Sequence, residues 1–220
     1  MRLKGYDEGS GRRVWLGRDE VALFLSEIDK IERQIALGFG IQCGLRTKEI
    51  LGVTVADIVE DDIVGSRVRV ENAKGGLYRE VPMPTGLKTT AKTYANVRDL
   101  DPDEPLVDRS RRSVQRWTIS IAEQCQEKTD DAGWSFLRPH DLRRTWGTLL
   151  VEAGVEPGMI MEWGGWKNWD TFREHYLGAY SPDMEKKQAA LVPWLDVDGE
   201  PAERSDPNDY MSINQSHHAN

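Results

Sequence analysis

The hydrophobic pattern of the first fifty residues begins without a period and then becomes helical. Residues 1–15 are rich in glycine and charge and are expected to form a flexible lead-in. From Asp19, a residue suited to an N-cap, apolar residues at helical spacing predict one long amphipathic helix. They are Val21, Phe24, Leu25, Ile28, Ile31 and Ile35. Gly38 and Gly40 should weaken this helix, and a short helix is expected over residues 47–51.

Strand-like runs follow the short helix. Residues 53–59, 63–70 and 77–81 are rich in β-branched and other apolar side chains, which predicts three strands. The two glycines after Lys74 are typical of a hairpin tip, so this lysine should lie at or just before the turn. A small three-stranded antiparallel sheet is therefore expected near the N-terminal third of the chain.

Helical patterns dominate from there to Leu191. The helices are expected over residues 85–97, from Ser110 or Ser113 to about 128, over 138–152 and 157–163, and from Trp169 or Asp170 to about 177. After Trp194 the apolar period is lost, and residues 195–220 should be a disordered acidic tail. The fold class predicted is α+β, mainly α-helical.

Length and composition narrow the class of protein. The 220 residues suit one sizeable core or two small ones, and no apolar run is long enough to span a bilayer. The N-terminus lacks the apolar segment of a signal peptide, so a cytoplasmic location is expected. Cys43 and Cys125 lie in apolar segments, which is typical of buried thiols rather than of a disulfide or metal ligands.

Six side chains of complementary chemistry occur along the chain. They are Arg46, Lys74, His140, Arg143, Trp166 and Tyr176. Two guanidinium groups, an ammonium, an imidazole, an indole N–H and a phenol are together what phosphoryl transfer onto tyrosine requires without a metal ion. The set predicts an enzyme that cuts and rejoins DNA strands, with no cofactor and no metal.

Three motifs that contain these residues resemble those of the tyrosine recombinases, the phage-integrase family that includes Xer and Cre-type enzymes. Residues 43–53 resemble the first box, in which Gly-Leu-Arg is followed three residues later by an acidic residue. Residues 139–145 resemble the His-x-x-Arg box, and residues 164–166 with Tyr176 resemble the last box and the nucleophile. The resemblance covers roughly residues 16–191.

The chemistry and the resemblance together give these residues expected roles. Arg46 and Arg143 should hold the scissile phosphate from opposite sides, because a guanidinium binds two phosphate oxygens and stays charged. Tyr176 should attack in line, and His140 should act as the base that removes its proton. Lys74 should protonate the leaving oxygen from its hairpin.

Two of these assignments have rivals. Tyr176 lies one residue further along than the commonest family spacing, so Tyr180 is a rival nucleophile. Tyr176 is preferred because it ends a helical pattern. Lys88 or Lys92 competes with Lys74 for the role of general acid.

Other polar residues are expected to support the site. Trp166 should donate its indole N–H to a phosphate oxygen, and Glu49 resembles the family's acidic residue that orients the active-site cations. A further basic set should either track the DNA backbone or form an ordinary solvated face. Its members are Arg109, Arg111, Arg112, Arg116, Arg144, Lys167 and Arg173.

The resemblance also implies partners and a domain organisation. It implies a recombinase catalytic domain over residues 16–194, double-stranded DNA as partner, and a homotetramer on that DNA, with neither a membrane nor a small-molecule substrate. The family's N-terminal DNA-clamping domain is expected to be absent, since residues 1–18 are too short for it. Residues 183–194 are either a segment that docks onto a neighbouring protomer or part of their own domain.

Net charge opposes a DNA-binding function. Asp and Glu outnumber Lys and Arg by 37 to 29, which gives a net charge of −8, whereas nucleic-acid-binding proteins are usually basic. Arginine outnumbers lysine and the acidic residues are clustered, a pattern that resembles proteins of halophilic archaea and their viruses. The Debye length falls to about 3 Å near 1 M salt, so repulsion of DNA would be weak there.

Two other functions fit the same residues. One is a catalytically silent DNA-binding regulator that occupies recombination sites. The other is a topoisomerase-like enzyme that relaxes supercoils through the same covalent step.

Overall fold

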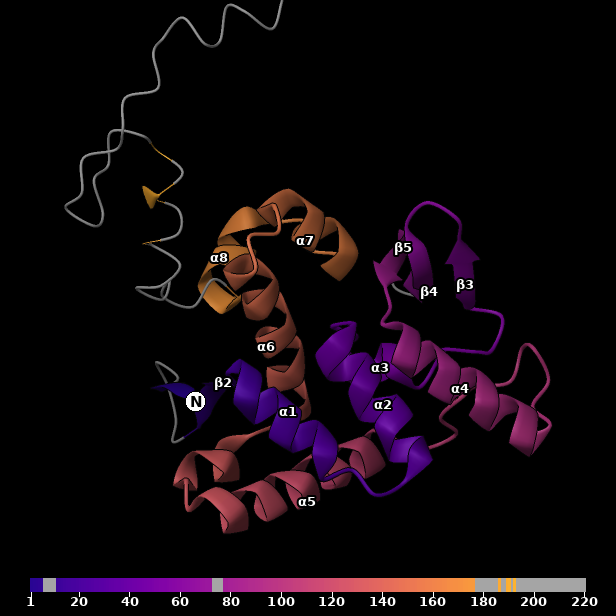
Figure 1. The fold of residues 1–220 in the computed structure, drawn as a ribbon, viewed down its shortest axis with the longest axis horizontal. Coiled ribbons are helices and arrows are strands. Elements are labelled where there is room, and N and C mark those ends of the chain that lie inside the picture. The colour runs from indigo at the N-terminus through magenta and orange to yellow at the C-terminus, as the bar shows by residue number, and fades with distance from the viewer. Residues whose placement is uncertain (6–10, 73–76, 177–185, 187–188, 191, 193–220) are drawn as a thin grey trace, which may run out of the picture. The chain divides into compact units, whose positions relative to one another are not determined.

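The chain divides into two units, Met1–Gly178 and Ala179–Asn220. The structure, a computed structural model, describes residues 1–5, 11–72, 77–176, 186, 189–190 and 192. The strands of the first unit are β1 (Arg2–Gly5), β2 (Arg12–Trp15), β3 (Ile58–Asp61), β4 (Gly65–Asn72) and β5 (Leu77–Pro82) (Figure 1). Its helices are α1 (Arg18–Ser26), α2 (Ile31–Gln42), α3 (Thr47–Ile50), α4 (Thr85–Arg98), α5 (Arg111–Thr129), the 3₁₀ helix η1 (Ala132–Phe136), α6 (Pro139–Glu152), α7 (Pro157–Gly164) and α8 (Trp169–Tyr176).

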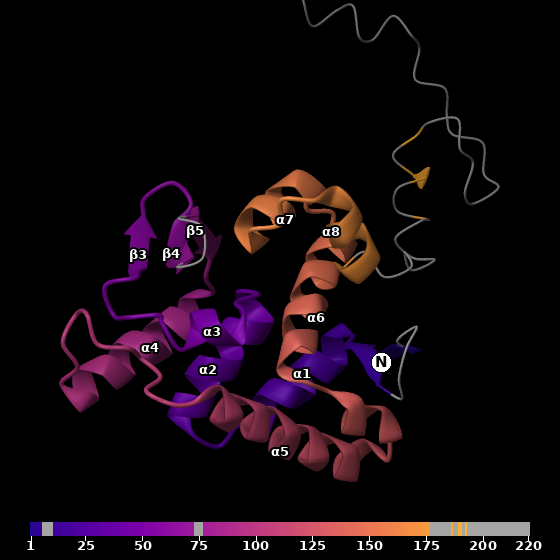
Figure 2. The ribbon, with the colours of Figure 1, turned by 180° about the vertical axis from the view of Figure 1, so that it is seen from behind.

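Helix α6 runs through the first unit from its α5 side to its α7 side (Figures 1 and 2). Helix α5 lies along one edge beside α1 and α2, whereas the β3–β5 sheet and α7 lie toward the opposite edge. The main core fills the space between α1, α2, α5, α6 and β2, and Phe24, Leu37, Ile121 and Leu142 are buried in it. The expected α+β, mainly helical fold is confirmed.

Strands β3, β4 and β5 form the expected three-stranded antiparallel sheet. Val68 of β4 pairs with Ile58 on one side and with Val81 on the other. The first strand begins at Ile58 rather than at residue 53. The reason is local, because the Asp57 carboxylate accepts hydrogen bonds from the amide and hydroxyl of Thr54, 2.8 and 2.9 Å away, and closes a turn there.

The single long helix expected from Asp19 is instead two helices, α1 and α2. The Ser26 hydroxyl donates a hydrogen bond to the carbonyl of Leu23, and the Gln34 side chain donates one to the carbonyl of Ile28. The Gln34 bond satisfies a carbonyl that a continuous helix would have paired internally, whereas the Leu23 carbonyl also accepts the amide of Glu27. The apolar period persists across the break because Ile28 remains buried in the core.

Gly38 and Gly40, which were expected to weaken the helix, lie inside α2, and the helix continues to Gln42. A Cβ atom at Gly38 would lie 2.8 Å from a methyl carbon of Leu87 in α4, and one at Gly40 would lie 3.3 Å from Leu142 in α6. Both glycines are therefore close-packing positions where neighbouring helices approach α2, and this packing offsets their weak helix propensity.

The N-terminal residues also differ from the expected flexible lead-in. Strands β1 and β2 pair antiparallel, and β2 packs beside α6. The amide of Val14 donates to the Asp141 carboxylate at 3.2 Å, and the amide of Leu16 donates to the Thr145 hydroxyl at 3.0 Å. Because Val14 and Leu16 are also buried, tertiary contacts fix a segment whose local composition has little preference for structure.

The later helices agree closely with expectation. Ser110 is the N-cap of α5, and its hydroxyl accepts a hydrogen bond from the amide of Ser113 at 3.2 Å. Pro139 and Pro157 occupy the first positions of α6 and α7, where their missing N–H groups cost nothing. Within the described residues, none of the helices is long and apolar enough to cross a membrane.

Candidate active site

The turn that follows α2 places Arg46 and Glu49 together. Arg46 is the N-cap of α3, and Glu49 is the third residue of that helix. One carboxylate oxygen of Glu49 accepts the Arg46 amide at 2.7 Å, and the other accepts the Arg46 guanidinium at 2.8 Å. The Arg46 side chain is 38% exposed, so its guanidinium is held by Glu49 and still reaches solvent.

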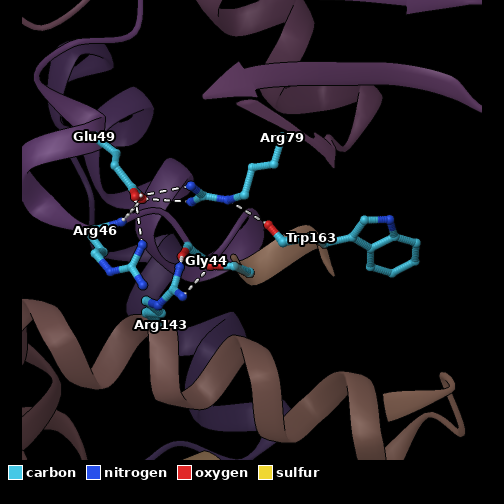
Figure 3. A network of polar contacts seen from close by, with 7 residues as sticks. Gly44, Arg46, Glu49, Arg79, Arg143 and Trp163 are labelled. Carbon is cyan, nitrogen blue, oxygen red and sulfur yellow. Dashed lines mark hydrogen bonds and ion pairs between the residues drawn. The ribbon is translucent and has the colours of Figure 1, made fainter. Parts of the chain in front are cut away.

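Arg79 of β5 is a further member of this site that the sequence analysis did not select. Two of its guanidinium nitrogens donate to the two oxygens of Glu49, at 2.8 and 3.1 Å, and its Nε donates to the carbonyl of Trp163 at 2.8 Å (Figure 3). Its side chain is only 7% exposed. Arg79 shares a strand face with the buried Val81, and a charged residue on a core-facing position was the signal available in the sequence.

These contacts shift the protonation equilibrium of Glu49. Burial of its carboxyl group would raise the pKa, but the hydrogen bonds and positive charges of Arg79 and Arg46 outweigh burial and lower the pKa to about 2. Glu49 is therefore an anion at neutral pH. It cannot serve as a general acid or base there, and its chemical contribution is to hold the two guanidinium groups.

Arg143 of α6 lies behind the same turn and is fully buried. Its guanidinium donates hydrogen bonds to the carbonyls of Gly44 and Gly164, the latter at 2.6 Å (Figure 3). The guanidinium carbon lies 4.1 Å from the centre of the Trp166 ring, a favourable cation–π arrangement. Arg143 thus joins the motif that contains Gly44 to the motif that contains Gly164, although these motifs and Arg143 are far apart in sequence.

We call Arg46, Glu49, Arg79 and Arg143 the arginine cluster. Two arginines in it have parallel structural roles. Arg79 connects Glu49 to the carbonyl of Trp163, and Arg143 connects the carbonyl of Gly44 to that of Gly164. The C-terminal end of α7 is therefore joined to α3 by Arg79 of the sheet, and to the turn before α3 by Arg143 of α6.

Trp166 packs into the wall of the cluster. It is 9% exposed, and its ring centre lies 6.0 Å from that of Trp146 and 5.1 Å from that of Phe172. The ring face is thus used by Arg143 and the neighbouring aromatic residues. Donation of its indole N–H to a phosphate oxygen remains a prediction.

His140 lies in the first turn of α6, three residues before Arg143, and is exposed. The i, i+3 spacing places the two residues on one side of the helix, with the imidazole outermost and the guanidinium buried. His140 is therefore accessible to a substrate that approaches the N-terminal end of α6. Its role as a base remains a prediction.

The nucleophile and the general acid are only partly located. Tyr176 is the last residue of α8, as the sequence pattern predicts, but the placement of its side chain lies outside the described residues. Lys74 and Tyr180 also lie outside them. The rival lysines are in α4, where Lys88 forms an ion pair with Glu60 at 2.7 Å.

The tentative backbone-contact set is not brought together on one face. Arg144 is a correction, because its side chain is 8% exposed and forms a buried ion pair with Asp141, which leaves it poorly placed to contact DNA. Arg109 is exposed and paired with Glu32. Arg111, Arg112 and Arg116 are exposed on α5, at the edge opposite to the sheet and α7 (Figures 1 and 2).

Lys167 and Arg173 lie nearer the arginine cluster. Both are exposed, Lys167 directly after Trp166 and Arg173 on α8. Lys167 lines a pocket of about 400 Å³ between β5 and α7, together with Arg67, Arg79 and Trp163. Glu80 and Glu162 also line this pocket, so its charge is mixed.

The described residues contain no group of three or more His, Cys, Asp or Glu side chains that could hold a metal ion. Cys43 and Cys125 are both buried free thiols, as expected. Burial raises the pKa of Cys43, and it raises the pKa of Cys125 to about 12. Neither thiol is therefore ionised at neutral pH, and neither is suited to nucleophilic catalysis.

A substitution at Gly44 tests the packing of the turn before α3. It has a φ of +64°, and a Cβ atom there would lie 2.2 Å from the Trp146 ring. Gly44→Ala should lower the free energy of unfolding by about 2–3 kcal/mol, through overpacking and the left-handed backbone, as measured by urea denaturation. Gly86→Ala is the control, because a Cβ atom there meets nothing within 4 Å. An unchanged stability in Gly44→Ala would contradict this packing.

Comparison with known proteins agrees with this geometry. The Phage integrase family matches residues 15–181. The chain is 28% identical to "Tyrosine recombinase XerA" of Thermococcus onnurineus over 183 residues, which cover 78% of this chain and 64% of that protein. It is 30% identical to the XerA of Thermococcus kodakarensis over 161 residues, which cover 71% of this chain and 55% of that protein. The chain therefore spans under two thirds of the length of these curated relatives.

Solved structures show the same fold. The crystal structure of XerA recombinase aligns with a TM-score of 0.65 at 17% identity, covering 81% of this chain and 64% of that one. The Tn1549 transposon integrase, solved in complex with a circular intermediate DNA, aligns with a TM-score of 0.63 at 18% identity, covering 85% of this chain and 68% of that one. The arginine cluster, the fold and the extent of the family match lead to one conclusion: the chain belongs to the Phage integrase family.

Proposed function

We propose that this chain cuts and rejoins double-stranded DNA through a covalent phosphotyrosyl intermediate, without a metal ion or ATP. The observation that carries the proposal is the arrangement of Arg46 and Arg143 around one turn, with Glu49 as an anion that binds Arg46 and Arg79. Guanidinium groups neutralise the phosphodiester charge that otherwise repels a nucleophile. Similarity to a tyrosine recombinase and to an integrase solved in complex with DNA supports the same activity.

The proposed reaction conserves the phosphodiester bond energy. The phenolic oxygen of Tyr176 attacks the scissile phosphorus, a P–O(Tyr) bond forms, and the bond to the leaving oxygen breaks to give a free hydroxyl on the other DNA end. His140 takes the phenolic proton, and Lys74 gives a proton to the leaving oxygen. Rejoining is the reverse attack by a DNA hydroxyl, which releases Tyr176.

The burial of the cluster suggests an order of events. A phosphate that approaches the turn meets the exposed Arg46 first. Arg143 contacts the phosphate only when its hydrogen bonds to the glycine carbonyls rearrange, because its guanidinium is fully buried in this structure. Trp166, stacked on Arg143, would limit how far that guanidinium moves and would offer its indole N–H to a phosphate oxygen.

We also propose that the protein acts as a homotetramer on DNA, in the cytoplasm of a halophilic host. The first statement rests on the family resemblance. The halophilic host is proposed because acidic residues outnumber basic ones by 37 to 29, and high salt would screen the repulsion between this negative charge and DNA. Activity in molar potassium chloride, together with the mass of the DNA complex by light scattering, tests both statements.

A covalent-adduct assay tests the proposed reaction. Because the target sequence is unknown, the probe is a library of nicked duplexes with a randomised centre, incubated at low and high salt. Wild-type protein should form an adduct that survives denaturing electrophoresis, and Tyr176→Phe should form none, because the attacking oxygen is missing. Peptide mapping then identifies the modified tyrosine.

The controls separate the alternatives. Tyr180→Phe should retain the adduct, whereas loss of the adduct only in that variant would transfer the nucleophile to Tyr180. DNA binding without any adduct would contradict the proposal and favour a silent regulator. Exchange between two sites on a plasmid distinguishes a recombinase from an enzyme that only relaxes supercoils.

A further inference from the structure

We propose that Arg79 is a positioning residue for the DNA-cleaving reaction, which keeps Arg46 positively charged toward the substrate and anchors the strand that follows Lys74. This inference rests on the proposed function. It extends that function to a residue that neither the motifs nor the expected catalytic set contains.

The first argument is the completeness of the Arg79 contacts. Each of its three guanidinium nitrogens is bound, two to Glu49 and one to the carbonyl of Trp163. The paired N–H···O bonds to Glu49 form the bidentate geometry that lysine cannot reproduce. At 7% exposure this side chain has little access to substrate, so its effect on the reaction passes through the groups that it binds.

The second argument concerns charge. Glu49 is ionised, with a pKa of about 2, and it contacts both Arg46 and Arg79. Two guanidinium groups and one carboxylate leave a net charge of +1 to face a phosphate. Without Arg79 the same carboxylate would neutralise Arg46 completely. Arg79 therefore preserves the attraction of Arg46 for the phosphodiester, although it does not contact the phosphate.

The third argument is the position of Arg79 along the chain. It lies two residues after Leu77, the first residue of β5, and five residues after Lys74. A Cβ atom at Gly165 would lie 3.2 Å from the Arg79 side chain, so this glycine leaves room for the arginine stem. Arg79 thus fixes β5, the strand that follows Lys74 in the sequence, against both α3 and the end of α7.

The test compares adduct formation by Arg79→Gln, Arg79→Lys and the double variant Arg79→Gln/Glu49→Gln. The substrate is the nicked DNA that forms an adduct with wild-type protein in the library assay. Arg79→Gln should slow the single-turnover rate on the order of tenfold, with the affinity for DNA changed much less. Arg79→Lys should lose less, because the charge remains. The double variant should recover part of the lost rate, because no carboxylate is left to neutralise Arg46.

Recovery of the rate indicates positioning only where the melting temperature does not recover with it, because removing both partners of a buried ion pair can also restore stability. Arg69→Gln is the matched control, an exposed arginine on the neighbouring strand β4 that pairs with Glu80, and it should cleave at the wild-type rate. Thermal melting of each variant confirms folding.

If the wild-type protein cleaves DNA and Arg79→Gln cleaves it at the same rate, the inference is overturned. It is also overturned if the double variant shows no recovery of the rate. A wild-type protein that forms no adduct instead overturns the proposed function, and the inference with it.

Discussion

Arg46→Lys should slow covalent adduct formation by about 10²–10³-fold while leaving the fold intact. The loss is expected because lysine keeps the charge but cannot bind two phosphate oxygens in one plane and Glu49 at the same time. The side chain is 38% exposed and its chief partner is the carboxylate of Glu49, so folding should tolerate the change. The measurement is the single-turnover rate of adduct formation at saturating protein, with DNA affinity determined separately by fluorescence anisotropy.

Arg98→Lys is the control for this experiment. Arg98 is an exposed arginine in the last turn of α4, whereas the contacts described for the arginine cluster come from α3, β5, α6, α7 and the turn before α3. Its rate should equal that of wild type. A similar decrease in both variants would indicate a general effect of surface charge, and a normal rate in Arg46→Lys would remove Arg46 from the reaction.

Those parts of the fold that depend on local signals could be predicted from the sequence. Proline and serine set the starts of α5, α6 and α7, and the apolar period gave their extent. The break between α1 and α2 escaped prediction because the apolar period continues through Ile28 while side chains satisfy the broken backbone bonds. The β1–β2 pair escaped it because contacts with α6, distant in sequence, fix β2.

The candidate site divides in the same way. Arg46, His140 and Arg143 lie in contiguous motifs, so the sequence alone selected them. Arg79 lies outside every motif, and its partners Glu49 and Trp163 are 30 and 84 residues away along the chain. Only the three-dimensional structure shows why a buried arginine is tolerated there. The same limit explains Arg144, which looked like a free basic residue and is the partner of Asp141.

Glu49→Gln should be strongly destabilising, because it leaves two guanidinium groups, one of them nearly buried, without their anion. Loss of one partner of a buried ion pair costs about 3–5 kcal/mol. The lowered pKa of Glu49 reflects the same contacts and gives a similar magnitude, since a fall from the ordinary value of 4.5 to about 2 corresponds to about 3 kcal/mol. Urea denaturation at neutral pH measures the difference between variant and wild type.

The pH dependence of that difference identifies its cause. A carboxyl group whose pKa is lowered by folding stabilises the protein fully above its unfolded pKa, near 4.5, and loses this contribution as the pH falls toward 2. The gap between wild type and Glu49→Gln should therefore be constant above about pH 5 and should narrow below it. Glu60→Gln removes an exposed carboxylate paired with Lys88 and should change stability little at any pH. A gap that stays constant down to pH 2 would mean that Glu49 stabilises the turn by packing and hydrogen bonding rather than by charge, and the charge argument for Arg79 would lose its basis.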